Sequence, residues 1–175
     1  MLSKRIITGI IVSTIMIALI LVFPGNLMAD GHGEGPGIER TEEIIMAYLN
    51  PEDPADIHDM NYVTDDVTYY DMSMGGIPMS SNREELADYL YWFYNVAFET
   101  EVEIRNMVIG NGQAVLEWIV MGTHIGEFAE IPPTGNTIEV PMIIRYKLQD
   151  HEPYHVERGW IYPMANLLMA QLLAE

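Results

Sequence analysis

The residue of this chain whose type and spacing best suit proton chemistry is His124. It alternates with Trp118, Val120 and Gly122, so these side chains are expected on one face of a strand. A glycine at position 122 would leave space above the sheet for a ligand beside the imidazole. The sequence therefore predicts that His124 donates or accepts a proton in a pocket that Trp118 also lines. The alternative is a histidine that packs against neighbouring strands and is hydrogen-bonded to a carbonyl.

A second candidate for acid–base chemistry is Asp71, which follows Tyr70 at the end of a segment rich in Val, Thr and Tyr. In one interpretation Asp71 accepts a proton at the mouth of the pocket and Tyr70 forms part of the wall. In the other it caps the Gly75-Gly76 loop that follows, which is a common use of Asp beside a turn. The second interpretation is the more frequent one in proteins.

Further candidates for the pocket wall are aromatic. Trp160 and Tyr162 alternate with Arg158, so all three share one face of a predicted last strand. Arg158 either reaches an acidic group of a ligand or pairs with one of the many acids of the chain. Tyr162 shares this face, and Trp92, on an aromatic helix, is placed to line the cavity.

No metal or cofactor is expected. The chain has no cysteine, which removes disulfides, thiol nucleophiles and thiolate ligands. His151 and His155 are four residues apart, a spacing that suits a metal on a helix, but they flank a predicted turn. No serine lies in the G-x-S-x-G pattern of a hydrolase nucleophile.

The charge of the chain excludes one class of partner. Its 26 acidic and 8 basic residues give a formal net charge of −18. Such a surface repels phosphate backbones, so nucleic-acid binding is excluded, and docking on anionic lipid headgroups is disfavoured.

The first 29 residues have the composition of an export signal. Lys4 and Arg5 precede an uncharged run over residues 6–23, and the small residue Ala29 follows. This pattern is typical of a secretory signal peptide, and the run is also long enough for a retained membrane anchor. Both alternatives place the domain outside the cytoplasmic membrane, in the periplasm or the medium, and any membrane contact is through this segment. Residues 30–39 are predicted to be a flexible linker and residues 40–175 the domain.

The elements that must position these side chains follow from periodicity. Helices are expected over 41–50, 54–62 and 82–97, the last opened by a capping box at Ser81–Glu84. A strand at 67–72 and a loop at 73–80 lie between the last two. Four long antiparallel strands are expected at 99–109, 113–127, 137–149 and 154–162, followed by a short helix from about 164. Helices followed by a meander predict an α+β fold, a curved antiparallel sheet wrapped on the N-terminal helices.

One segment resembles a known family. Residues 121–135 read Met-Gly-Thr-His-Ile-Gly-Glu-Phe-Ala-Glu-Ile-Pro-Pro-Thr-Gly. They are similar to the pattern G-T-H-x-G-x-F-x-G-I-P-P-T-G of SnoaL-like polyketide cyclases, also called predicted ester cyclases, except that Glu130 replaces a glycine. The resemblance covers residues 40–173 and implies the cone-shaped fold of the nuclear transport factor two-like superfamily. It also implies an aromatic or polycyclic ligand and a homodimer.

The family's chemistry is an intramolecular aldol closure in which an aspartate of the last strand moves a proton next to a carbonyl. Alignment with the family places Met164 at this aspartate, and neither Pro163 nor Ala165 is an acid. Three hypotheses follow. The first is an enzyme of the cyclase or isomerase type that acts on an apolar or polycyclic carbonyl compound through His124, Asp71 and Tyr162. The second is a non-catalytic binder of an apolar small molecule, with Met164 in its pocket wall. The third is a purely structural or dimerising domain.

Overall fold

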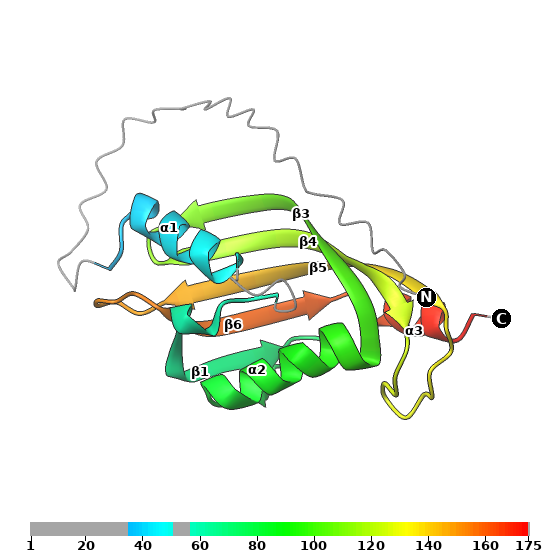
Figure 1. Ribbon diagram of the computed structural model, residues 1–175. Coiled ribbons are helices and arrows are strands. Elements are labelled where there is room, and N and C mark those ends of the chain that lie inside the picture. The colour runs from blue at the N-terminus through cyan, green and yellow to red at the C-terminus, as the bar shows by residue number, and fades with distance from the viewer. Residues whose placement is uncertain (1–34, 51–56, 175) are drawn as a thin grey trace, which may run out of the picture. The chain divides into compact units, whose positions relative to one another are not determined.

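The computed structural model describes residues 35–50 and 57–174, which form a six-stranded curved sheet with helices (Figure 1). The predicted signal segment over residues 1–29 lies outside the described residues. Among those residues, no helix is both long and apolar enough to cross a bilayer. The strands are β1 Val63–Asp71, β2 Ile77–Ser80, β3 Phe98–Gly110, β4 Gln113–His124, β5 Thr137–Leu148 and β6 Val156–Pro163. The helices are α1 Ile38–Tyr48, η1 Met60–Tyr62, α2 Arg83–Tyr91, η2 Trp92–Ala97 and α3 Ala165–Leu172.

The sheet has the order β2-β1-β6-β5-β4-β3. Strands β3 to β6 form the predicted antiparallel meander, and the α+β fold is confirmed. The strand predicted at 67–72 is β1, which begins earlier, at Val63, and joins the same sheet. Because β1 pairs in parallel with β6, the expectation of a purely antiparallel sheet is wrong at this one pairing. The predicted loop over 73–80 is wrong in its second half, because β2 folds back on β1 there. Gly75 and Gly76 have φ values of 80° and 77°, and such a left-handed pair allows the tight turn of a hairpin.

Helix α1 begins three residues earlier than predicted, so residues 38 and 39 belong to it and not to a linker. Thr41, the predicted first residue, is buried inside the helix. Its Oγ1 donates to the carbonyl of Gly37 at 2.9 Å and accepts from the backbone N–H of Gly112, also at 2.9 Å. This threonine therefore ties α1 to the β3–β4 turn. Of the helix predicted over 54–62, the described part holds only the single turn η1.

Helix α2 is capped one residue later than predicted. The side chain of Asn82 accepts from the N–H of Glu85 at 2.9 Å, and Glu85 accepts from the N–H of Ser81 at 2.8 Å. The helix then continues as the π-helical segment η2 to Ala97. Figure 1 shows α1 and α2 over the same face of the sheet, α2 near β1 and α1 near β3 and β4, and contacts agree. The hydrophobic core fills the space between these helices and the sheet.

Candidate functional site

The last strand places its candidate side chains away from the core. Residues Lys147 and Leu148 of β5 pair with Arg158 and Val156, so Glu157 is left over as a β-bulge. Because one extra residue reverses the alternation of a strand, the inward and outward faces of β6 exchange after Val156. Gly159 and Ile161 therefore face the helices, and the candidates at 158, 160 and 162 face outward.

The outward candidates form a surface group of their own. Trp160 stacks on Tyr70, with ring centroids 6.0 Å apart, and the guanidinium of Arg145 lies 4.7 Å from the Trp160 ring centroid. Arg158 is exposed, and Tyr162 is 43% exposed. The prediction that Trp160 and Tyr162 share one enclosed pocket with Trp118 and His124 is therefore wrong. The same bulge removes Arg158 from a pocket wall, and Tyr70 of β1 lies on the outward face as well, stacked on Trp160.

His124 lies on the predicted inward face of β4 and is fully buried. Its Nδ1 accepts from the backbone N–H of Thr134 at 3.2 Å and lies 3.0 Å from the Thr134 hydroxyl. The expected space above Gly122 is not open, because a Cβ there would clash with the backbone carbonyl oxygen of Glu99. His124 therefore anchors the loop between β4 and β5, as a packed histidine whose partner is Thr134 instead of a carbonyl.

A cavity of about 230 Å³ lies between α2, η2, the β1–β2 hairpin, β5, β6 and α3. Aromatic side chains and methionines dominate its wall. These are Tyr89, Phe93, Tyr94 and Phe128 together with Met74, Met79, Met142 and Met169. Methionine adapts its shape to an apolar partner and makes favourable sulfur–aromatic contacts, so this wall suits a flat apolar ligand. We call this space the methionine cavity.

Few polar groups reach the methionine cavity. Among the described residues that line it, Asp71 is the only carboxylate. Its Oδ1 accepts from the backbone N–H of Ser73 at 2.8 Å and from the Ser73 hydroxyl at 2.6 Å. Asp71 therefore caps its own loop while it lies at the cavity rim. Burial, and the charge of Asp71 to a smaller extent, raise the pKa of Tyr89, and burial raises that of Tyr94, so both phenols stay protonated donors.

Two other predicted wall residues lie beside or away from this cavity. Trp92 stacks on Phe128 with ring centroids 5.9 Å apart, so it supports the wall from behind. Met164 precedes α3, is 53% exposed and does not line the cavity. The inward positions around it are Ile161, Pro163 and Ala165, and none of them is an acid.

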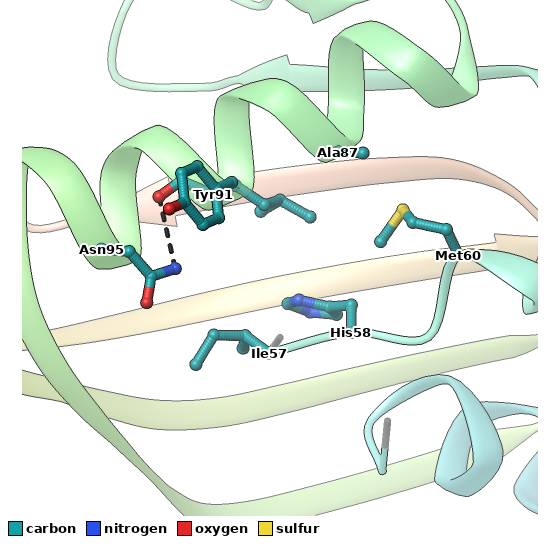
Figure 2. Close-up of a pocket in the computed structure, with 7 residues that line it drawn as sticks. Ile57, His58, Met60, Ala87, Tyr91 and Asn95 are labelled. Carbon is teal, nitrogen blue, oxygen red and sulfur yellow. Dashed lines mark hydrogen bonds between the residues drawn. The ribbon is translucent and has the colours of Figure 1, made fainter. Parts of the chain in front are cut away.

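A second cavity, of about 130 Å³, lies between the segment 57–60 and α2. Figure 2 shows His58 inside it, with Ala87 and Tyr91 of α2 across the space. His58 is 3% exposed, and its ring packs against Tyr48 and Trp118, with ring centroids 4.5 and 5.7 Å away. We call this space the histidine cavity.

Sequence reasoning missed His58, because it lies outside any regular element and no spacing singles it out. Its buried surroundings include a chain of phenols: the hydroxyls of Tyr48 and Tyr69 are 2.6 Å apart, and the Tyr146 hydroxyl lies 3.5 Å from His58 Nε2. Burial raises the pKa of all three tyrosines. Trp118, a predicted pocket residue, packs here edge-on to His58 and not beside His124. No group of three or more His, Asp or Glu within residues 35–50 and 57–174 could hold a metal ion.

Comparison with known proteins supports the fold. The model of the SnoaL-like domain matches residues 44–152. No curated protein matches the chain. A candidate SnoaL-like polyketide cyclase from Jannaschia sp. CCS1 has 16% sequence identity and a TM-score of 0.67, over 83% of this chain and 99% of that one. IdmH, a candidate polyketide cyclase from Streptomyces antibioticus, has 18% identity and a TM-score of 0.58, over 77% of this chain and 99% of IdmH. AclR, a candidate hydroxylase from Streptomyces galilaeus, has 17% identity and a TM-score of 0.60, over 77% of this chain and 82% of AclR.

Proposed function

Because this chain belongs to the SnoaL-like family, we propose that it uses the family's fold to bind an apolar, ring-containing small molecule in the methionine cavity. The observation that carries the proposal is the composition of the wall, in which aromatic and methionine side chains predominate and Asp71, at the rim, is the only carboxylate among the described lining residues. Cavities of this kind take up ligands through apolar contact, and a few polar groups orient them. Here Tyr89 and Tyr94 are the phenol donors available for that purpose.

The wall also favours binding over acid–base catalysis. The family's acid corresponds to Met164, and the inward positions Ile161, Pro163 and Ala165 of the same segment cannot transfer a proton. The remaining carboxylate, Asp71, already accepts two hydrogen bonds from Ser73. A carboxylate that accepts hydrogen bonds in its charged form is a weaker base.

A second candidate function rests on the position of Asp71. Its carboxylate is close enough to Tyr89 to raise the pKa of that phenol, and both residues line the cavity. A carbonyl compound bound there could lose a proton to Asp71 while Tyr89 donates a hydrogen bond to the enolate oxygen. This arrangement would support a cyclase or isomerase reaction.

The binding function is tested with the neutral fluorescent probe N-phenyl-1-naphthylamine. We expect it to bind with a blue-shifted emission and the variant Ala165→Phe to weaken this binding at least about tenfold, because a ring at 165 fills the cavity. Ala170→Phe, on an exposed position of the same helix, is the matched control and should bind as the unmodified chain does. Equal binding by all three chains would contradict the proposal.

The two functions are separated by Asp71→Asn. This change keeps the shape of the side chain and removes its charge. If the protein only binds, probe affinity is retained and no carbonyl compound that displaces the probe is converted by either chain. If Asp71 is a base, the unmodified chain converts such a compound and the variant does so about 10²-fold more slowly.

A further inference from the structure

The histidine cavity contains a buried polar atom with no partner. Nδ1 of His58 makes no hydrogen bond within the part of the chain that the structure describes, although the residue is only 3% exposed. A buried polar group without a partner destabilises the folded chain, so a site of this kind is stabilised when a ligand supplies the missing hydrogen bond. Figure 2 shows the imidazole lying in the space that Ile57, Met60 and Ala87 border.

We propose that the histidine cavity binds a second, smaller ligand than the methionine cavity: an uncharged single-ring aromatic compound with one hydroxyl group, a phenol. Its hydroxyl exchanges a hydrogen bond with His58 Nδ1. Its ring packs against Ile57, Met60 and Leu90.

The size of the cavity selects one ring. Its volume of about 130 Å³ is close to that of an engineered apolar cavity of about 150 Å³ that takes up benzene. The sulfur of Met60 and the aliphatic side chains of Ile57 and Leu90 provide the apolar contact that a ring needs. A polycyclic ligand does not fit this volume.

The surroundings of His58 select an uncharged hydroxyl. Among the described residues that line the cavity, none is an acid, a lysine or an arginine. Burial lowers the pKa of His58 to about 3, so the imidazole is neutral at physiological pH and cannot pair with an anion. A hydroxyl both donates and accepts, and it therefore satisfies Nδ1 in either tautomer of the ring.

The histidine cavity is distinct from the methionine cavity. Leu90 lines both, so this one side chain of α2 lies between them. At the opposite end, Tyr91 and Asn95 are exposed, and the Asn95 side-chain amide donates to the Tyr91 carbonyl at 3.3 Å. This pair therefore forms the solvent-exposed part of the cavity lining.

The test uses two fluorinated probes and ¹⁹F NMR titration of the full chain. 4-Fluorophenol carries the hydroxyl and fluorobenzene lacks it. We expect the chain to bind 4-fluorophenol about tenfold more tightly than fluorobenzene, because one buried hydrogen bond changes the dissociation constant by about this factor. His58→Phe keeps an aromatic ring at this position and should abolish the preference.

A second variant distinguishes loss of the histidine cavity from loss of the folded structure. Ala87→Phe fills the histidine cavity from α2 and should remove binding of both fluorinated probes while N-phenyl-1-naphthylamine still binds. Ala165→Phe should show the reverse pattern, so the failure of either ligand site is recognised separately. The proposal is overturned if neither fluorinated probe binds the unmodified chain, which would indicate a site for water only. It is also overturned if His58→Phe keeps the preference or Ala87→Phe keeps both affinities.

Discussion

At the scale of single residues, the burial of His58 couples protonation to stability. Burial lowers its pKa from 6.5 to about 3 in the folded chain, whereas the unfolded chain exposes the imidazole. Between these two values the unfolded state binds the extra proton, so stability is complete above pH 6.5 and falls as the pH decreases toward 3. The slope for one such group is about 1.4 kcal/mol per pH unit.

We therefore expect the free energy of unfolding to fall by about 2 kcal/mol between pH 7 and pH 5 through His58 alone. Urea denaturation of the unmodified chain and of His58→Phe at both pH values measures this contribution as the difference between the two slopes. Burial also lowers the pKa of His155, but both chains retain that group, so it does not enter the difference. Equal pH dependence in the two chains would show that His58 is not buried in its neutral form.

At the scale of elements, the loop between β4 and β5 holds the C-terminal helix in place. The side-chain amide of Asn136 donates to the carbonyls of Gln171, Leu172 and Ala174 at 3.2, 3.1 and 2.9 Å. The last carbonyls of a helix lack partners within it, so Asn136 acts as an external cap for α3. This helix carries Leu168 and thereby one wall of the methionine cavity.

Asn136→Ala should lower the free energy of unfolding by about 1–2 kcal/mol, because three carbonyls lose their donor. It should also speed hydrogen exchange of the α3 amides and weaken probe binding in the methionine cavity. The control is Asn166→Ala, an exposed position on α3, where we expect a change below about 0.5 kcal/mol. If both variants have the same stability, the cap contributes nothing.

The elements also show what can be predicted from the sequence. The alternation of side chains along β4 correctly placed Trp118 and His124 on the same, inward face, since the strand is regular between these two residues. The same argument correctly grouped Arg158, Trp160 and Tyr162 on one face, but that face points outward, because the bulge at Glu157 reverses the faces of β6. No composition signal marks this bulge, and its position depends on pairing with β5, which only the folded sheet contains.

The candidate site was less predictable than the fold. The Gly-Thr-His segment identified the family, but its histidine fixes a loop through Thr134, which is a tertiary contact that spacing does not reveal. The sequence offered two alternatives for Asp71, a proton acceptor at the cavity mouth or a cap of the following loop, and the side chain both lies at the cavity rim and caps the loop. His58 had no local pattern, because its neighbours Tyr48, Trp118 and Tyr146 come from three separate elements.

At the scale of the whole domain, the outward face of the sheet remains available for association. Val115, Ile143 and Tyr162 are 40%, 47% and 43% exposed on neighbouring strands. A cluster of exposed apolar side chains on one face is typical of a protein–protein contact. We expect this face to join two copies of the chain into a homodimer.

Sedimentation equilibrium measures the dimer. Ile143→Glu should shift the population toward monomer by a factor of about ten or more, because it puts a charge into an apolar contact. Val96→Glu, at an exposed position on η2 and away from this face, is the control and should leave the dimer intact. Added salt should strengthen the dimer, since it screens the repulsion between two chains of net charge −18. A monomer at all salt concentrations would contradict the expectation.

The parallel pairing of β1 with β6 has a consequence for the order in which the chain folds. Thr68 pairs with Arg158, so about 90 residues must be made before this contact can form. Each of the strands β3 to β5 pairs with the strand that follows it in the chain, so β3 to β6 can assemble first, whereas β1 must wait for the last strand before it has a partner besides β2. A chain interrupted before residue 156 therefore has no native place for β1, and its apolar side chains Val63, Val67 and Tyr69 stay uncovered. Completion of the sheet is therefore a late event that follows synthesis of nearly the entire sequence.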